Sequence, residues 1–187
     1  KGCAMGQGID DAIMQRVESL SGFAQARIAC RQAAGGLDFE FPEARVILDA
    51  SGKPCGVDLR VKNQATSLVE EAMILANEVV AAHLHERDFP ALYRVHEKPS
   101  PDSLAALLPV LSEFSWFDRI SPERFVAGDA HAVQQVLSES QGRLEADLVQ
   151  ALVLRAMKRA CYKPECEGHY GLASAAYAHF TSPIRRY

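Results

Sequence analysis

The residues best suited to chemistry stand together near the end of the chain. Residues 176–187 read AYAHFTSPIRRY, a run that combines aromatic rings, hydroxyls and two adjacent arginines. Guanidinium groups are planar forks that bind phosphate oxygens in pairs. Ser182 precedes Pro183, which fits the first turn of a helix, so Ser182 is predicted as an N-cap whose helix offers free N–H groups to an anion. The run predicts a phosphate-binding corner, and a plain capped helix with solvated arginines is the alternative.

Hydrophobic periodicity predicts the elements that position this run. Apolar residues at three- and four-residue steps predict a helix over residues 10 to about 34. Arg27 and Arg31 fall on one face of it and are predicted to be solvated, with RNA contact as the alternative. Alternation over residues 37–61 predicts a hairpin with one buried face. The strongest helix is predicted at residues 66 to about 86. The apolar face predicted for that helix consists of Leu68, Ala72, Leu75, Val79 and Ala82.

The second half of the chain is predicted to be mostly helical. The predicted elements are a short strand at 91–95, a helix from 102 or 103 through 111, an aromatic connector packed on the core at 112–125, and helices at about 129–140 and 144–160. Residues 162–178 are rich in Gly and Tyr and lack periodicity, so they are predicted as a loop. Loops of this kind often carry function on a rigid scaffold.

The composition is that of an ordinary globular chain. Of its 187 residues, 48% are hydrophobic and 24% are charged, with a formal net charge of −4, which fits one domain or two small ones. No apolar run reaches the length of about 18 residues that predicts a membrane span, and no secretory leader is evident. Five cysteines are scattered without a CxxC pair, so we expect reduced thiols and a cytoplasmic protein.

Five motifs, in order along the chain, resemble those of the ribonuclease II / ribonuclease R family, the RNB-domain 3′→5′ exoribonucleases. The segments are GLDF with PEA at 36–44, VEEAMILAN at 69–77, ALYRVHE at 91–97, GHYGLA at 168–173 and HFTSPIRRY at 179–187. They look like the family's ALDF…PEA, EExMxxAN, ALYRVHE, GHFGLA and HFTSPIRRY. The resemblance implies an α+β fold, a partial RNB-type catalytic domain with helices packed around a mixed, mostly antiparallel sheet.

The same resemblance implies a function for the intact protein. That function is Mg²⁺-dependent hydrolysis of single-stranded RNA from its 3′ end to nucleoside 5′-monophosphates, with no membrane and no obligate protein partner. Residues 1–187 are interpreted as the C-terminal portion of the catalytic domain, truncated at both ends. The metal-binding aspartates and flanking RNA-binding barrels would lie outside it, so we expect no metal ligand in this chain and no hydrolysis by this piece alone. The alternatives are a catalytically inactive RNA-binding homologue and a structural helical domain.

Residue roles follow from the resemblance alone. It puts the family's catalytic arginine at Arg185, where it would stabilise the scissile phosphate, with Arg186 in support. It puts the aromatic clamp for the RNA 3′ end at Phe39, and the glutamate that contacts the terminal nucleotide at Glu70. The remaining RNA-binding candidates are Tyr170, Tyr177, His179, Thr181 and Ser182.

Several candidates also have a plainer interpretation. Glu70, Met73 and Asn77 share one stripe of the predicted helix, apart from its apolar face. The S-x-x-E spacing that ends at Glu70 is that of a capping box, a role compatible with nucleotide binding. Phe39 fits equally well as a core residue, and Asn77 fits as a polar surface residue.

Metal sites within the chain find little support in the sequence. Asp10 and Asp11 are adjacent, but acidic residues at a helix start are normal partners of the helix dipole. Cys161, Cys166 and His169 lack a fourth zinc ligand, and their spacing is loose. Neither group predicts a metal site.

Overall fold

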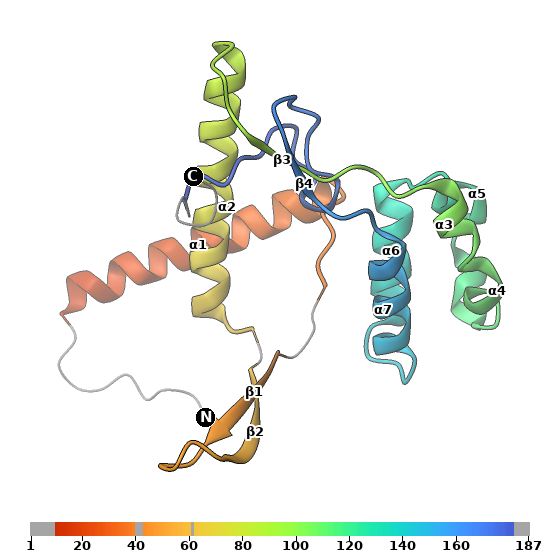
Figure 1. The fold of residues 1–187 in the computed structure, drawn as a ribbon, viewed down its shortest axis with the longest axis horizontal. Helices are drawn as coiled ribbons and strands as arrows, with labels where there is room; N and C mark the ends of the chain where they lie inside the picture. Colours follow the sequence, from red (N-terminus) through yellow and green to blue (C-terminus); the bar gives the residue numbers. More distant parts are fainter. Residues whose placement is uncertain (1–9, 40–42, 61, 182–187) are drawn as a thin grey trace.

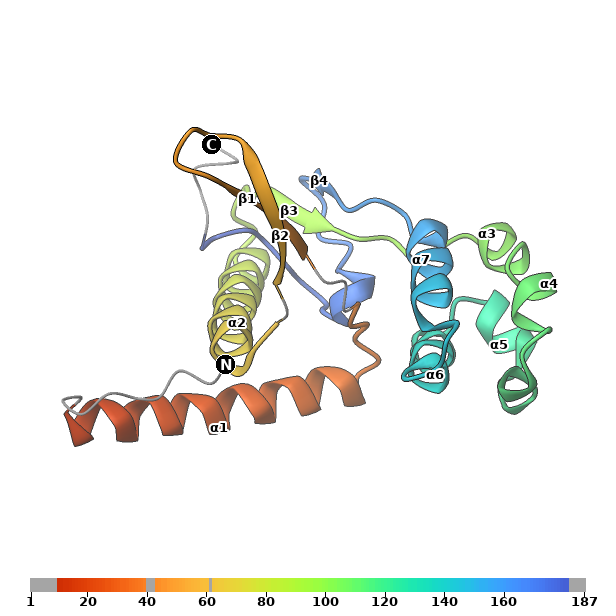
Figure 2. The ribbon, with the colours of Figure 1, turned by 90° about the horizontal axis from the view of Figure 1, so that it is seen from below.

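The computed structural model describes residues 10–39, 43–60 and 62–181. Two long helices, α1 (Asp11–Ala33) and α2 (Gln64–Glu86), cross and pack against each other (Figures 1 and 2). Both views show the shorter helices gathered in a separate lobe beside this crossing. The two long helices lie where periodicity predicts them, so this part of the prediction is confirmed.

Side-chain caps start both long helices. The Asp10 carboxylate accepts a hydrogen bond from the Ala12 N–H at 2.9 Å, which is the capping role expected of an acidic residue at this place. In α2 the Asn63 side chain accepts from the Thr66 N–H at 2.9 Å, while the Thr66 hydroxyl accepts from the Asn63 N–H at 2.9 Å. The capping box predicted to end at Glu70 is therefore wrong, because the helix begins earlier and caps itself with other residues.

The buried face of α2 is not its most apolar stripe. Its buried residues are Glu71, Ile74, Asn77 and Ala81, whereas Val79 on the predicted face is 57% exposed. Hydrophobicity alone misplaces the face because two of the four buried residues are polar. Each of these two has a partner outside α2, so tertiary contacts decide which face turns inward.

The partner of Glu71 is an arginine of α1. Both Nη2 and Nε of Arg31 donate to Oε1 of Glu71, at 2.8 and 3.2 Å, in an almost fully buried ion pair. One turn away, Arg27 pairs with Glu78 at 2.5 Å. The prediction that these arginines are solvated is wrong, because α2 brings a carboxylate to each of them and joins the two helices.

The described strands form two antiparallel ribbons. Strands β1 (Glu43–Leu48) and β2 (Pro54–Arg60) pair with Val46 opposite Val57, and β3 (Tyr93–Val95) pairs with β4 (Cys161–Lys163). The mixture of helices and small antiparallel sheets confirms the predicted α+β class. The buried face predicted for the hairpin is wrong, since Val46 and Val57 are 55% and 66% exposed and the hairpin projects from the rest of the chain (Figure 1).

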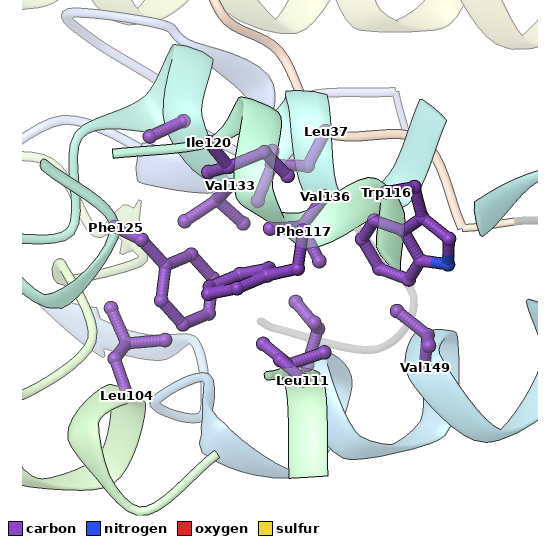
Figure 3. Close-up of a cluster of buried hydrophobic side chains, with 12 residues drawn as sticks. Leu37, Leu104, Leu111, Trp116, Phe117, Ile120, Phe125, Val133, Val136 and Val149 are labelled. Carbon is purple, nitrogen blue, oxygen red and sulfur yellow. The ribbon is translucent and has the colours of Figure 1, made fainter. Parts of the chain in front are cut away.

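Most of the core lies in the helical lobe, residues 101–157. Its helices are α3 (Pro101–Ala105), α4 (Leu108–Leu111), α5 (Pro122–Val126), α6 (Ala130–Ser140) and α7 (Ala146–Ala156), with a 3₁₀ turn at Ser115–Arg119. Phe117 and Phe125 pack edge to face with ring centroids 6.1 Å apart, and aliphatic side chains surround them (Figure 3). The prediction that the aromatic connector packs on the core is confirmed.

The lobe is tied to the rest of the described chain through Leu37. This residue belongs to the lobe's core although it follows α1, and its N–H donates to the carbonyl of Gly171 at 2.8 Å. A second, smaller core gathers Tyr93 and Val95 of β3 with Ala81 of α2 and two alanines of the C-terminal segment, residues 174–181. No helix of the described residues is both long and apolar enough to cross a membrane.

Candidate functional site

A pocket of about 900 Å³ opens between α2 and the C-terminal segment. This site pocket lies within the size range of ligand sites in proteins. Its lining from α2 includes Glu70, Met73 and Asn77, the stripe that the sequence sets apart from the apolar face. The other lining residues are Asn63, Ala65, Thr66, Val69, Ile74, Arg94, His169, Leu172, Tyr177, His179 and Thr181. The structure therefore brings together Glu70, Tyr177, His179 and Thr181 from the predicted RNA-binding residues.

One buried amide connects the two walls of the site pocket. Asn77 is 2% exposed, and its Nδ2 donates to the hydroxyl of Tyr177 at 3.0 Å. Its Oδ1 accepts from the backbone N–H of Thr181 at 2.9 Å and from the Thr181 hydroxyl at 3.1 Å. The interpretation of Asn77 as a polar surface residue is therefore wrong. Asn77 fixes the backbone immediately before Ser182, where the SPIRRY run begins.

Aromatic rings that meet edge to face form one wall of the site pocket. The Tyr177 ring lies edge-on between His169 and His179, with centroid distances of 5.3 and 5.6 Å. The hydroxyl of Tyr162 lies 2.6 Å from Nδ1 of His179, and the Arg94 guanidinium lies 5.0 Å from the centre of the Tyr162 ring. Flat surfaces next to a cation are the features on which single-stranded nucleic acids stack.

Burial keeps His169, one of the two histidines on this wall, uncharged. Burial, together with the nearby His96 and Arg94, lowers the pKa of His169 to about 4. Its Nδ1 accepts a hydrogen bond from the Leu172 N–H at 3.3 Å, so the neutral ring carries its proton on Nε2. His169 thus offers the pocket a flat, neutral ring at physiological pH.

Glu70 lies at the rim of the site pocket and is paired with a lysine. Its carboxylate is 46% exposed and lies 2.7 Å from Nζ of Lys62. The same lysine lies 3.7 Å from the Asp38 carboxylate. Ion pairs this exposed contribute little to stability, so Glu70 can exchange Lys62 for a ligand at small cost.

Two predicted residues lie outside the site pocket. The Tyr170 hydroxyl donates to the carbonyl of Gly128 at 3.2 Å, and burial raises the pKa of Tyr170 to about 12. Phe39 packs against the core of the helical lobe and lines a different cavity. Phe39 is therefore partly buried against the core, which agrees in part with its interpretation as a core residue. The clamp role of Phe39 and the RNA contact of Tyr170 stay predictions.

The remaining site predictions concern residues that the structure does not describe. Arg185, the predicted catalytic residue, lies outside the described residues together with Ser182 and Arg186. Among the residues that are described, no three His, Cys, Asp or Glu side chains come together as a metal site.

Comparison with known proteins decides the family. A family model described as RNB domain matches residues 4–187. The chain belongs to the RNB domain family. Ribonuclease R of Aquifex aeolicus (strain VF5) is 42% identical over 157 residues, which are 84% of this chain and 22% of that protein. Ribonuclease R of Escherichia coli (strain K12) is 35% identical over 179 residues, 94% of this chain and 21% of that protein.

Solved structures agree with this RNB assignment. The apo form of Mycoplasma genitalium RNase R superposes with a TM-score of 0.83 at 26% sequence identity, over 96% of this chain and 28% of that one. The structure of the same RNase R with ribose-methylated single-stranded RNA has the same fold, with a TM-score of 0.81 at 24% identity. The chain spans about a fifth of the length of the curated RNB relatives named above.

Among the residues of the site pocket that sequence reasoning missed are Asn77 and Arg94. Asn77 could have been identified from the sequence, because it lies on the same helical stripe as Glu70. Arg94 lies in the ALYRVHE motif, but nothing in the sequence set it apart from the other residues of that motif. The backbone N–H of Arg94 donates to the carbonyl of Tyr177 at 2.8 Å, and this hydrogen bond places β3 beside the C-terminal segment.

Proposed function

We propose that the intact protein is a 3′→5′ exoribonuclease that hydrolyses single-stranded RNA to nucleoside 5′-monophosphates. Membership of the RNB domain family supports this activity, as do relatives named Ribonuclease R that are 35% and 42% identical. The observation that carries the proposal within this chain is the Asn77 contact. It holds Thr181, the residue that precedes the SPIRRY run in the sequence, beside a pocket lined by aromatic rings, a carboxylate and an arginine.

Each predicted residue has a specific task in this proposal. Arg185 stabilises the charge that develops on the scissile phosphate, because a guanidinium can donate two parallel hydrogen bonds to phosphate oxygens. Ser182 and Arg186 bind neighbouring phosphate oxygens. Glu70 accepts a hydrogen bond from a hydroxyl of the terminal ribose, a group that DNA lacks at the 2′ position.

The rings and hydroxyls have the remaining tasks. Tyr177 and His179 form a flat wall for the bases, and the Thr181 hydroxyl binds the strand next to Ser182. Phe39 clamps the 3′-terminal base, and Tyr170 contacts the RNA strand. These assignments rest on the family resemblance and on the positions of the side chains around the site pocket.

The proposed activity uses a divalent metal, Mg²⁺, whose ligands lie outside the described residues. The described part of this chain does not fit the metal, because Mg²⁺ requires clustered carboxylate oxygens and no such cluster is found there. The chain therefore contributes the RNA pocket and the phosphate-binding arginine, and this piece alone should not hydrolyse RNA.

The test uses the intact protein, Mg²⁺ and a labelled RNA with a single-stranded 3′ extension. We expect mononucleotides as the product, and loss of turnover by about 10²-fold or more in Arg185→Ala, the scale seen when one donor to a transition-state charge is removed. Arg143→Ala, an exposed arginine of the helical lobe, is the matched control and should behave as wild type. If RNA binds and no mononucleotide forms, the protein is an inactive RNA-binding homologue instead.

A further inference from the structure

A second cavity, of about 710 Å³, adjoins the site pocket and shares His169 and Leu172 with it. It lies where the loop at 168–174 meets the end of α7, and Phe39 and His96 line it as well. Nothing in the proposed roles above uses this cavity except Phe39. Its volume fits one small ligand and lies within the usual range for such sites.

One wall of the second cavity carries three cations, two of which have no counter-charge among the described residues. Arg155 stands in the last turn of α7, and Lys158 and Arg159 follow the helix. Lys158 is already neutralised, because its Nζ lies 2.5 Å from the Glu97 carboxylate. Neither Arg155 nor Arg159 has an ion-pair or hydrogen-bond partner among the described residues. The wall therefore presents two unpaired guanidinium groups.

Another part of the lining of the second cavity consists of neutral rings. Nδ1 of His96 accepts from the Gly171 N–H at 3.1 Å, and its Nε2 lies 2.8 Å from the carbonyl of Lys158. A carbonyl can only accept, so Nε2 carries the proton and the ring is uncharged. The His96 and His169 rings meet edge to face with centroids 5.0 Å apart, and Phe39 adds a third ring to the lining.

We propose that the second cavity binds a nucleoside 5′-monophosphate, with the phosphate on Arg155 and Arg159 and the base against the His96 and His169 rings. Two guanidiniums match a phosphate that carries up to two charges, and rings accept any base because every base has a π-face. This inference rests on the proposed function for its biological meaning, since mononucleotides are the products of that reaction. The cavity then receives the product next to the pocket that generates it.

The same nucleotide chemistry could come from a free product or from one unit of an RNA strand. We assign the free product because the two arginines line a cavity of single-ligand size, whereas a strand needs a continued path of cations. Binding measurements separate the two sources, using AMP, adenosine and a single-stranded RNA of about ten nucleotides. EDTA is present throughout, so no RNA is hydrolysed and binding is measured independently of activity.

The test compares the intact wild-type protein with the double variant Arg155→Gln/Arg159→Gln. We expect AMP affinity to fall by at least about tenfold, because each lost charge-assisted hydrogen bond is worth that much or more. Adenosine, which lacks the phosphate, should bind the two proteins equally weakly. Arg119→Gln, an exposed arginine elsewhere on the lobe, should bind AMP as wild type does.

Three results would overturn the assignment. One is unchanged AMP affinity in the double variant, and another is no AMP binding by the wild-type protein at millimolar concentration. A third is a loss of RNA affinity as large as the loss of AMP affinity, which would assign the cavity to the strand. Both arginines are exposed, so the variants should fold, and a thermal melt checks this. Failure of hydrolysis with intact AMP binding would refute the proposed function alone.

Discussion

The buried amide of Asn77 offers the sharpest test of how the site is built. Asn77→Ala removes three hydrogen bonds at once, one to the Tyr177 hydroxyl and two from Thr181. A hydrogen bond of this kind contributes about 1 kcal/mol net. Thr181 is only partly buried, so water replaces some of what it loses. We therefore expect the C-terminal segment to be about 2–3 kcal/mol easier to detach from α2.

Hydrogen–deuterium exchange of the Thr181 amide measures this loss directly. That N–H donates to Asn77, so its exchange reports the local opening rather than unfolding of the whole protein. A loss of about 2–3 kcal/mol corresponds to exchange faster by roughly 30- to 150-fold. Because SPIRRY begins at the next residue, we also expect hydrolysis to slow by about 10²-fold, the scale of a misplacement near 1 Å.

Val79→Ala is the matched control for this experiment. It shortens a side chain on the same helix that is 57% exposed, and surface changes of this kind usually alter stability by less than about 0.5 kcal/mol. If Asn77→Ala exchanges the Thr181 amide as slowly as Val79→Ala does, the amide does not hold the segment. A normal hydrolysis rate with fast exchange would separate anchoring from catalysis and refute the second half of the reasoning.

Three further predictions concern the surrounding structure. Arg31→Gln leaves the buried Glu71 carboxylate without its cation and should lower stability by about 3–5 kcal/mol in a denaturation experiment. Gly171→Ala places a Cβ 2.9 Å from Nδ1 of His96, so the melting temperature should fall and the His96 imidazole resonances should shift. Two lysines that donate hydrogen bonds to Glu97 lower its pKa from 4.5 to about 2. This carboxylate therefore stabilises the fold fully above pH 4.5, and that contribution is lost as pH falls through about 2.

Each of these three predictions has its own control. Arg16→Gln changes an exposed arginine of α1, and a loss of stability equal to that of Arg31→Gln would contradict the buried-pair argument. Gly22→Ala adds a Cβ with no atom within 4 Å, so it should leave the melting temperature unchanged or raise it. Glu97→Gln should remove the acid-dependent part of stability that Glu97 supplies. If the stability of Glu97→Gln depends on pH in the same way as that of wild type, Glu97 does not supply this stabilisation.

Local pattern predicted the helices well but not their orientation. The periodicity that marks α1 and α2 is a property of nearby residues, and it gave their positions within a few residues. The buried face of α2 depends on Arg31, which lies forty residues from Glu71 along the chain. A charge pair leaves no trace in a hydrophobic pattern, so neither the buried arginine nor the true inner face could be predicted.

The site was predictable where motifs were dense and not where a single residue acts at long range. The family motifs pointed to Glu70, Tyr177, His179 and Thr181, and the structure gathers all four around one pocket. Asn77 lies in the same VEEAMILAN motif as Glu70, but its residue type fitted an ordinary surface position. Its partner Thr181 lies 104 residues away in the sequence, and only the three-dimensional path of the chain brings them together.

The 104-residue separation of Asn77 from Thr181 has a consequence for the order of assembly during protein synthesis. The ribosome completes α2 long before it releases the residues that Asn77 will hold. In the interval the helical lobe can fold from contacts that are mostly local, which form quickly. The pocket closes only when Thr181 emerges, so a ribosome that stalls before Thr181 would leave a folded lobe beside an open, incomplete site pocket.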